Sequence, residues 1–64
     1  MKLLFELEKE TKGALRYQQM RLVEGVCQPY EVSEGAEVGT IYIRKHALPS
    51  KPVLLYITIE EHDV

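Results

Sequence analysis

Four side chains that could bind an anion gather in one short stretch: Arg44, Lys45, His46 and Lys51. The stretch reads GTIYIRKHALPSKP, residues 39–52, which begins as a strand and ends as a loop interrupted by prolines. Guanidinium and ammonium groups on a rigid turn can bind phosphate or carboxylate oxygens. Charges at a hairpin end more commonly keep the turn solvated, and lysines there discourage pairing between sheet edges. We expect a solvated turn first and an anion site second.

Two tyrosines could extend this loop into a nucleic-acid interface. Tyr42 and Tyr56 are expected on the same face of neighbouring strands, and Arg44 follows Tyr42 at the next position on that face. Bases can stack on tyrosines while cations contact phosphates. The competing interpretation is that tyrosine and threonine only stabilise a solvated sheet face through cross-strand pairs. Further candidates for this face are Arg16, Tyr17, Leu54 and Thr58. The candidate set for nucleic-acid or anion binding is Tyr42, Arg44, Lys45, Lys51 and Tyr56.

The other reactive residues do not form a catalytic or metal-binding pattern. Cys27 is the only cysteine, so the chain has no internal disulfide, and no CxxC or HxxxH pair offers zinc ligands. Gly35 and Gly39 lack the lysine and hydroxyl residue of a phosphate-binding P-loop. Paired carboxylates of the glycosidase type need a deep cleft, which a chain of 64 residues scarcely builds. We therefore expect no enzyme activity, no cofactor and no metal site.

Length and charge narrow the possible classes further. The 64 residues suit one domain, residues 1–64, and a domain of this size buries only about 60% of the surface that its unfolded chain exposes. Domains this small are usually stabilised by disulfides, a metal or association with another chain. Because the first two are not expected here, we predict a homodimer. The formal net charge of −2 argues against a general polyanion binder. The apolar run at the N-terminus is interrupted by Glu6, which is too early for a signal peptide or a membrane span. The protein is therefore predicted to be cytoplasmic.

Alternating apolar residues predict strands in three segments. Leu3, Phe5 and Leu7 alternate in the first, and residues 38–45 and 53–60 alternate in the same way with many β-branched and aromatic residues. KETKG follows the first segment, with Gly13 available for a positive φ, so a hairpin into residues 14–23 is expected. That segment is ambiguous, because its Ala, Leu, Arg, Gln and Met also favour a helix. The hairpin makes a strand the preferred prediction.

The predicted fold is all-β, or α+β if residues 14–23 are helical: a small antiparallel sheet of about four strands, meander or barrel-like. Residues 24–37, with Gly, Pro, Ser and four glutamates, are expected to form a long loop, and residues 60–64 a short acidic tail. One face of the sheet is too apolar to stay uncovered on a soluble monomer. Either the sheet curls or two copies pack face to face, which is the simpler answer. The apolar face comprises Leu3, Phe5, Leu7, Ile41, Ile43, Val53, Leu55, Ile57 and Ile59.

The order of three blocks resembles a group of small uncharacterised bacterial proteins. The blocks are KETKGALRY, VGTIYIRKHAL and VLLYITIE, and the resemblance implies no activity. Gly39, Ile41, Ile43 and Lys45 are also similar to the G-x-[IVL]-x-[IVL]-P-K strand of AbrB-type swapped-hairpin DNA-binding domains, with Arg44 where that pattern has proline. This second resemblance implies that Arg44 and Lys45 would contact DNA.

Two functions follow from these observations. The first is a non-catalytic β module that homo-oligomerises or binds another protein. The alternative is a nucleic-acid-binding regulator that uses the Tyr42, Arg44 and Tyr56 face with the 44–51 loop. Salt dependence separates the two, because phosphate contacts weaken steeply as the salt concentration rises.

Overall fold

Five strands make up most of the structure, a computed structural model that describes residues 1–63. The strands are β1 Lys2–Glu10, β2 Ala14–Val23, β3 Val26–Pro29, β4 Thr40–Arg44 and β5 Leu54–Thr58, with 3-10 turns η1 Val32–Glu34 and η2 Lys45–Ala47. The all-β prediction is confirmed, and residues 14–23 form a strand rather than a helix. All pairings belong to one antiparallel sheet that is not closed. Residues 60–63 of the expected tail have no regular structure, and Val64 lies outside the described residues.

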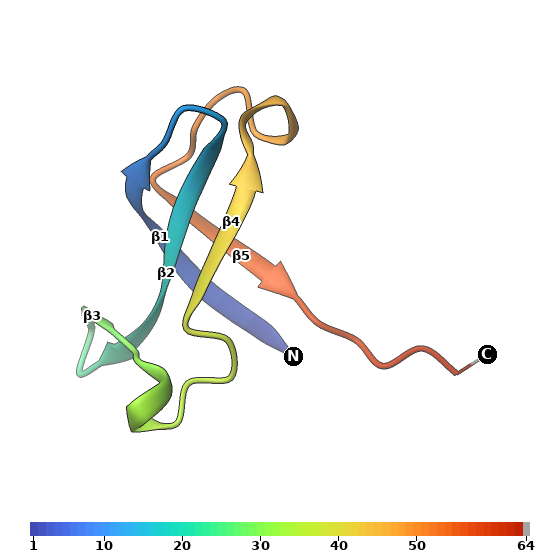
Figure 1. The fold of residues 1–64 in the computed structure, drawn as a ribbon. Helices are drawn as coiled ribbons and strands as arrows, with labels where there is room; N and C mark the ends of the chain where they lie inside the picture. The colour runs from blue at the N-terminus through green and yellow to red at the C-terminus, as the bar shows by residue number, and fades with distance from the viewer. Residues whose placement is uncertain (64) are drawn as a thin grey trace.

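The hairpin β1–β2 is the centre of this sheet (Figure 1). β5 pairs with the free edge of β1, while β4 and β3 share the other edge of β2, opposite its N-terminal and C-terminal halves respectively. The expectation that β4 and β5 are neighbouring strands joined by a hairpin is therefore wrong. Residues 45–53 instead connect β4, which pairs with β2, to β5, which pairs with β1 at the opposite edge of the sheet. Alternation predicted the strands but could not specify their partners, because it reports only which face is buried.

The turn between β1 and β2 is closed by Thr11 rather than by a special glycine conformation. The Thr11 amide donates to the Ala14 carbonyl oxygen at 2.8 Å, and the Ala14 amide donates to the Thr11 hydroxyl oxygen at 3.1 Å. Gly13 does not adopt the positive φ that we expected. A threonine side chain that bonds the backbone two or three residues away substitutes for the glycine-dependent turn.

The core lies on the inner face of the curled sheet. Its buried cluster consists of Leu3, Phe5, Leu15 and Tyr17. Ile41 and Ile43 of β4, and Leu55 and Ile57 of β5, pack against this same cluster although they belong to opposite edges of the sheet. The sheet must therefore curl, as the crossing of β4 and β5 in Figure 1 illustrates. A curled sheet covers much of its own apolar face within one chain.

Three residues differ from the burial that the sequence predicted for them. Tyr17 belongs to the core and is fully buried, not on the outer face. Val53 and Ile59, expected in the core, are 62% and 43% exposed because they lie at the two ends of β5. The pairing of Leu15 with Ile43 and of Tyr17 with Ile41 gives the reason for the first change, since cross-strand partners share a face.

Residues 24–37 are more ordered than the long loop that we expected. Glu24 and Gly25 have φ of 52° and 80°, which makes a two-residue turn that pairs β3 with the end of β2. η1 follows, with Glu31 and Glu34 forming a reciprocal capping box and Gly35 ending the turn in the left-handed region. The segment turns back towards β4 and is held against β2.

Candidate functional site

The outer face of the sheet carries both tyrosines of the candidate set, but on opposite edges. Tyr56 of β5 pairs with Leu4, which pairs with Met20, whereas Tyr42 of β4 pairs with Arg16. Two strands and four residues of offset separate the tyrosines, which corresponds to roughly 20 Å at ordinary strand spacing. They do not form one stacking platform. The structure thus separates what the sequence suggested was a single site.

Carboxylates occupy the outer face between the two edges. Glu6 lies in the middle of β1, and Glu8 follows it with an oxygen 3.7 Å from Arg16. A shallow depression of about 380 Å³ is lined by Glu6, Glu8 and Glu31 together with apolar side chains. A nucleic-acid strand that touched both tyrosines would pass these acidic groups, which repel its phosphates.

Two of the predicted cations are already paired inside the molecule. The ammonium groups of Lys45 and Lys51 both contact Glu10, the first at 3.3 Å. These contacts, with Lys51 first, hold the pKa of the Glu10 carboxyl below its usual value. A β-bulge at Glu8 makes the arrangement possible, because it shifts the register so that Glu10 pairs with Leu15 of the inner face. Glu10 therefore points to the rim where residues 45–53 pass.

Arg44 differs from the two lysines, because its guanidinium forms no ion pair with another group of residues 1–63. It is exposed at the end of β4, and none of the ion pairs among residues 1–63 includes it. His46 is exposed in η2 beside it. Within residues 1–63, the loop 44–51 therefore offers one guanidinium outside any ion pair, while Glu10 offsets one of the two positive charges of its lysines.

Gln19 is a buried polar residue that the sequence analysis missed. Only 2% of it is exposed. Its amide oxygen accepts hydrogen bonds from the Val38 and Gly39 amides, both at 3.0 Å, and its amide nitrogen donates to Glu37 at 2.9 Å. The Gln19 side chain thus fixes the chain just before β4. Sequence reasoning could not single out Gln19, because Tyr17, two residues before it on the same face, was expected on the outer face.

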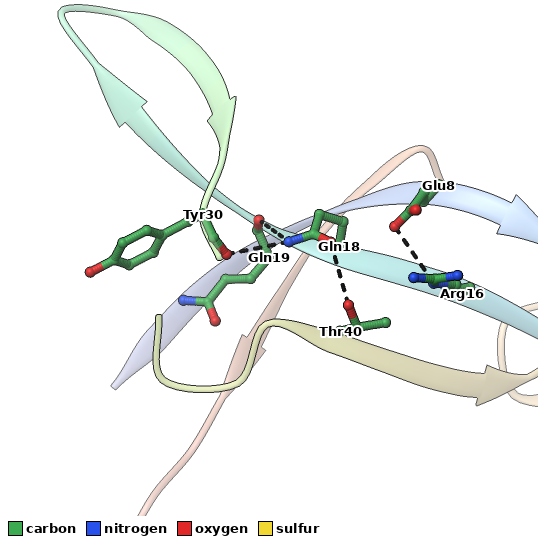
Figure 2. A network of polar contacts seen from close by, with 6 residues as sticks. All are labelled: Glu8, Arg16, Gln18, Gln19, Tyr30 and Thr40. Atoms are coloured by element: carbon green, nitrogen blue, oxygen red, sulfur yellow. Dashed lines mark hydrogen bonds and ion pairs between the residues drawn. The ribbon is translucent and has the colours of Figure 1, made fainter. Parts of the chain in front are cut away.

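Gln18, on the outer face, completes this anchor from the other side (Figure 2). Its amide nitrogen donates to the carbonyl oxygens of Gln19 and Tyr30, each at 3.3 Å, and its amide oxygen accepts from the Thr40 hydroxyl at 3.4 Å. Arg21 adds a contact nearby, with its guanidinium 4.7 Å from the Tyr30 ring centre and 3.2 Å from Glu34. These groups hold the 30–40 segment to β2, which is a structural role.

Within residues 1–63, the outer edge of β5 is one of the sheet edges that no strand pairs with. Met1 and Ile59 exchange two backbone hydrogen bonds, and the Leu7 amide donates to the Val53 carbonyl oxygen at 2.7 Å. Hydrogen-bonded residues alternate along an antiparallel pair. The odd-numbered residues of β5 therefore bond to β1, and the amides and carbonyls of Leu54, Tyr56 and Thr58 point away from it. Among residues 1–63 no strand pairs with that edge.

The side chains along this edge are unusually apolar for an unpaired strand. Val53–Ile59 contains no charged residue, proline or glycine. Leu54 and Tyr56 are 53% and 58% exposed, and Lys2 lies over the Tyr56 ring at 4.7 Å from its centre. Unpaired strands of this composition are templates for pairing with another chain, and most proteins protect them with charge or proline. The edge can therefore accept a further strand.

The reactive residues are not brought together by the fold. Cys27 is exposed in β3 beside the C-terminal half of β2, whereas His46 lies in η2, which follows the end of β4 near Gly13. Within residues 1–63, no group of three histidine, cysteine or acidic side chains is placed to hold a metal ion. Nor does that part of the chain include a helix with the length and apolar character needed to cross a membrane.

Comparison with known proteins adds no relative. No family model matches the chain, and neither a curated protein nor a solved structure matches it. The two resemblances noted from the sequence therefore stay predictions.

Proposed function

We propose that this chain is a non-catalytic, cytoplasmic β module whose function is to bind another polypeptide strand. The observation that carries the proposal is the free β5 edge, which combines outward-facing amides with an uncharged apolar sequence. Strand addition uses main-chain hydrogen bonds for affinity and alternate side chains for selectivity. Such binding should change little with salt, because few charges take part.

Hydrogen exchange tests this proposal residue by residue. The probe is a synthetic peptide that copies residues 51–61, added to the full chain while amide exchange is followed by NMR. Protection should appear at the outward amides of Leu54, Tyr56 and Thr58, either on adding the peptide or on raising the protein concentration. The outward amides of Tyr42 and Arg44 in β4 serve as the internal control. If the β5 amides exchange as fast as these two under both conditions, the proposal is wrong.

The second proposal, nucleic-acid binding, is now restricted to one edge. Tyr42 and Arg44 lie on β4, and Arg16 is the cross-strand partner of Tyr42, so one stacking ring and two cations share a small area. Fluorescence anisotropy with short single-stranded oligonucleotides at low salt is the test. Arg44→Ala should weaken binding and reduce its salt dependence, whereas Tyr56→Ala should leave it unchanged. Absence of binding by the wild type at tens of micromolar ends this alternative.

A further inference from the structure

We infer that the strand bound at the β5 edge is β5 of a second copy of this chain, paired antiparallel about a two-fold axis at Tyr56. The inference rests on the proposed function, and it names the partner of the same edge. It differs from the face-to-face dimer expected from the sequence, because the apolar face is already packed within one chain. Joined edge to edge, the two sheets form one continuous sheet across the axis.

The outward amides restrict the possible registers. Residues that exchange hydrogen bonds across the new pair must have outward-facing groups in both copies, so only even-numbered residues of β5 can face each other in that way. With Tyr56 opposite itself, Leu54 faces Thr58 of the second copy. Every residue of the uncharged segment Val53–Ile59 is then paired, with Val53 opposite Ile59, and about six backbone hydrogen bonds form.

Neighbouring registers are less favourable for identifiable reasons. A shift of two residues in one direction places Pro52 opposite Thr58, and proline has no amide hydrogen to donate. A shift of two in the other direction places Glu60 opposite Leu54, which sets a carboxylate beside an apolar side chain. The register centred on Tyr56 avoids both.

The charges that flank the segment are complementary in this arrangement. Lys51, which shares Glu10 of its own chain with Lys45, precedes Val53–Ile59, whereas Glu60 and Glu61 follow it. Antiparallel pairing sets the acidic end of each copy beside the lysine end of the other. A parallel arrangement would place like charges together at both ends. Charges across an interface select orientation and register in this way.

Pairing of this kind closes the assembly at two copies. A two-fold contact uses the same edge in both partners, so the dimer has no free β5 edge. The outer edges that remain belong to β4 and β3. Arg44 lies at the end of β4, and Glu24 lies in the turn that begins β3. A charge on an edge strand discourages further pairing, so the dimer should not grow into a filament.

Cysteine cross-linking tests the register directly. In a Cys27→Ser background, Tyr56→Cys should form a disulfide-linked dimer under oxidised glutathione, because paired residues have Cα atoms about 5.5 Å apart, within the range that a disulfide spans. Leu54→Cys mixed with Thr58→Cys should give mainly the mixed dimer, and each alone much less. Tyr42→Cys, equally exposed but on β4, is the matched control. Cross-linking of Tyr42→Cys at the same rate as Tyr56→Cys overturns the inference.

Oligomeric state separates this inference from the proposed function. Analytical ultracentrifugation of the wild type should show a monomer–dimer equilibrium with no larger species. Tyr56→Lys should raise the dimer dissociation constant by about 100-fold, because two new ammonium groups face each other beside Lys2 of each copy. Tyr42→Lys should change it less than about twofold. A monomer at every concentration whose β5 amides are protected only by the peptide overturns the dimer and leaves strand binding intact.

Discussion

Two of the outer strands, β4 and β5, are alike in geometry but differ in the charges that protect their edges. Each is a five-residue strand, and each packs alternate side chains against the same core. Amides point away from the sheet at Tyr42 and Arg44 of β4 and at Leu54, Tyr56 and Thr58 of β5, whereas the Thr40 amide donates to the Val38 carbonyl oxygen at 3.2 Å. Yet Arg44 belongs to β4 and the cationic 3-10 turn η2 follows at once, whereas the nearest charges around β5 lie outside the seven residues Val53–Ile59. Charges therefore discourage strand pairing at the β4 edge, whereas the β5 edge lacks this protection.

The two strands also differ in how they are anchored. The entry to β4 is fixed by the buried Gln19 side chain and by Gly39, whose φ of 84° turns the chain into the strand. The entry to β5 is fixed by Tyr17, whose hydroxyl donates to the Pro52 carbonyl oxygen at 2.7 Å. Buried amide contacts therefore hold the entry to β4, whereas the approach to β5 is held by the Tyr17 hydroxyl and by the more exposed ion pair between Lys51 and Glu10.

The largest loss of stability is expected from Gly39→Ala. A Cβ at this position would lie 2.7 Å from a Val32 methyl group, and the positive φ adds strain. The free energy of unfolding should fall by about 3 kcal/mol. Gly25→Ala is the control, because Gly25 also has a positive φ but its Cβ would meet nothing within 4 Å. It should cost about 1 kcal/mol from strain alone.

Urea denaturation measures this difference, and hydrogen exchange locates it. In Gly39→Ala the amides of Ile41 and Ile43, which bond to β2, should exchange faster, while that of Ile57, which bonds to β1, should change little below the global limit. Equal acceleration in both strands would show that the two edges are not anchored independently, and the comparison between them would fail.

A somewhat smaller effect is expected from Gln19→Met. The substitution keeps the approximate size of the side chain but leaves the Val38 and Gly39 amides without an acceptor. Unfolding should become easier by about 2 kcal/mol, because buried donors that lose their partner carry a desolvation cost. Gln28→Met on the exposed strand β3 should be nearly neutral. Equal stability of the two variants in urea would mean that Gln19 does not hold the entry to β4.

Tyr17→Phe probes the corresponding anchor of β5. The variant removes one hydroxyl that is buried with the core and leaves the Pro52 carbonyl without its donor. A loss of about 1 kcal/mol is expected in thermal and urea unfolding. Tyr42→Phe, with an exposed ring, is the matched control and should not change the stability. If Tyr17→Phe also strengthens strand binding at β5, then this anchor restrains the edge; unchanged binding would separate anchoring from function.

Alternation in three segments, together with the hairpin signal before residues 14–23, predicted four of the five strands but not their partners. Leu3, Phe5, Ile41, Ile43, Leu55 and Ile57 all fall on the predicted apolar face. The neighbours of β4 and β5 depend instead on the curl of the whole sheet. The alternation of apolar residues reports only which face of a strand is buried. β3 was missed because its four residues end in Pro29 and show no alternating burial.

The candidate site was harder to predict because it depends on pairing and on a bulge. The set Tyr42, Arg44, Lys45, Lys51 and Tyr56 was chosen on the assumption that β4 and β5 are adjacent. The bulge at Glu8 redirected Glu10 to the two lysines, and no feature of KLLFELEKE distinguishes this register from a regular one. The open β5 edge, by contrast, could have been inferred from its uncharged sequence once the order of strands was known.

The smallest predicted effect concerns the stability contributed by Glu10, whose carboxylate contacts both lysines of the segment between β4 and β5. Because Lys51 and Lys45 lower its pKa in the folded protein, the folded state favours the carboxylate more than the unfolded state does. The stabilisation is therefore complete above the ordinary value of 4.5 and disappears as the pH falls through the lower pKa of the folded state. Glu10→Gln should melt slightly below the wild type at pH 7, and the difference should vanish in acid.

Melting temperatures from pH 7 down to pH 3 test this, with Glu60→Gln in the tail as a control for the loss of one negative charge. Glu37, whose pKa is lowered by the hydrogen bond from Gln19, titrates in the same direction, but it does so in both proteins and cancels in the difference. High salt should shrink the effect, since all three side chains are exposed enough to be screened. Release of both lysines in Glu10→Gln should also add positive charge to the loop beside Arg44. If oligonucleotide binding appears only in this variant, then Glu10 is what keeps the 44–51 loop from acting as an anion site.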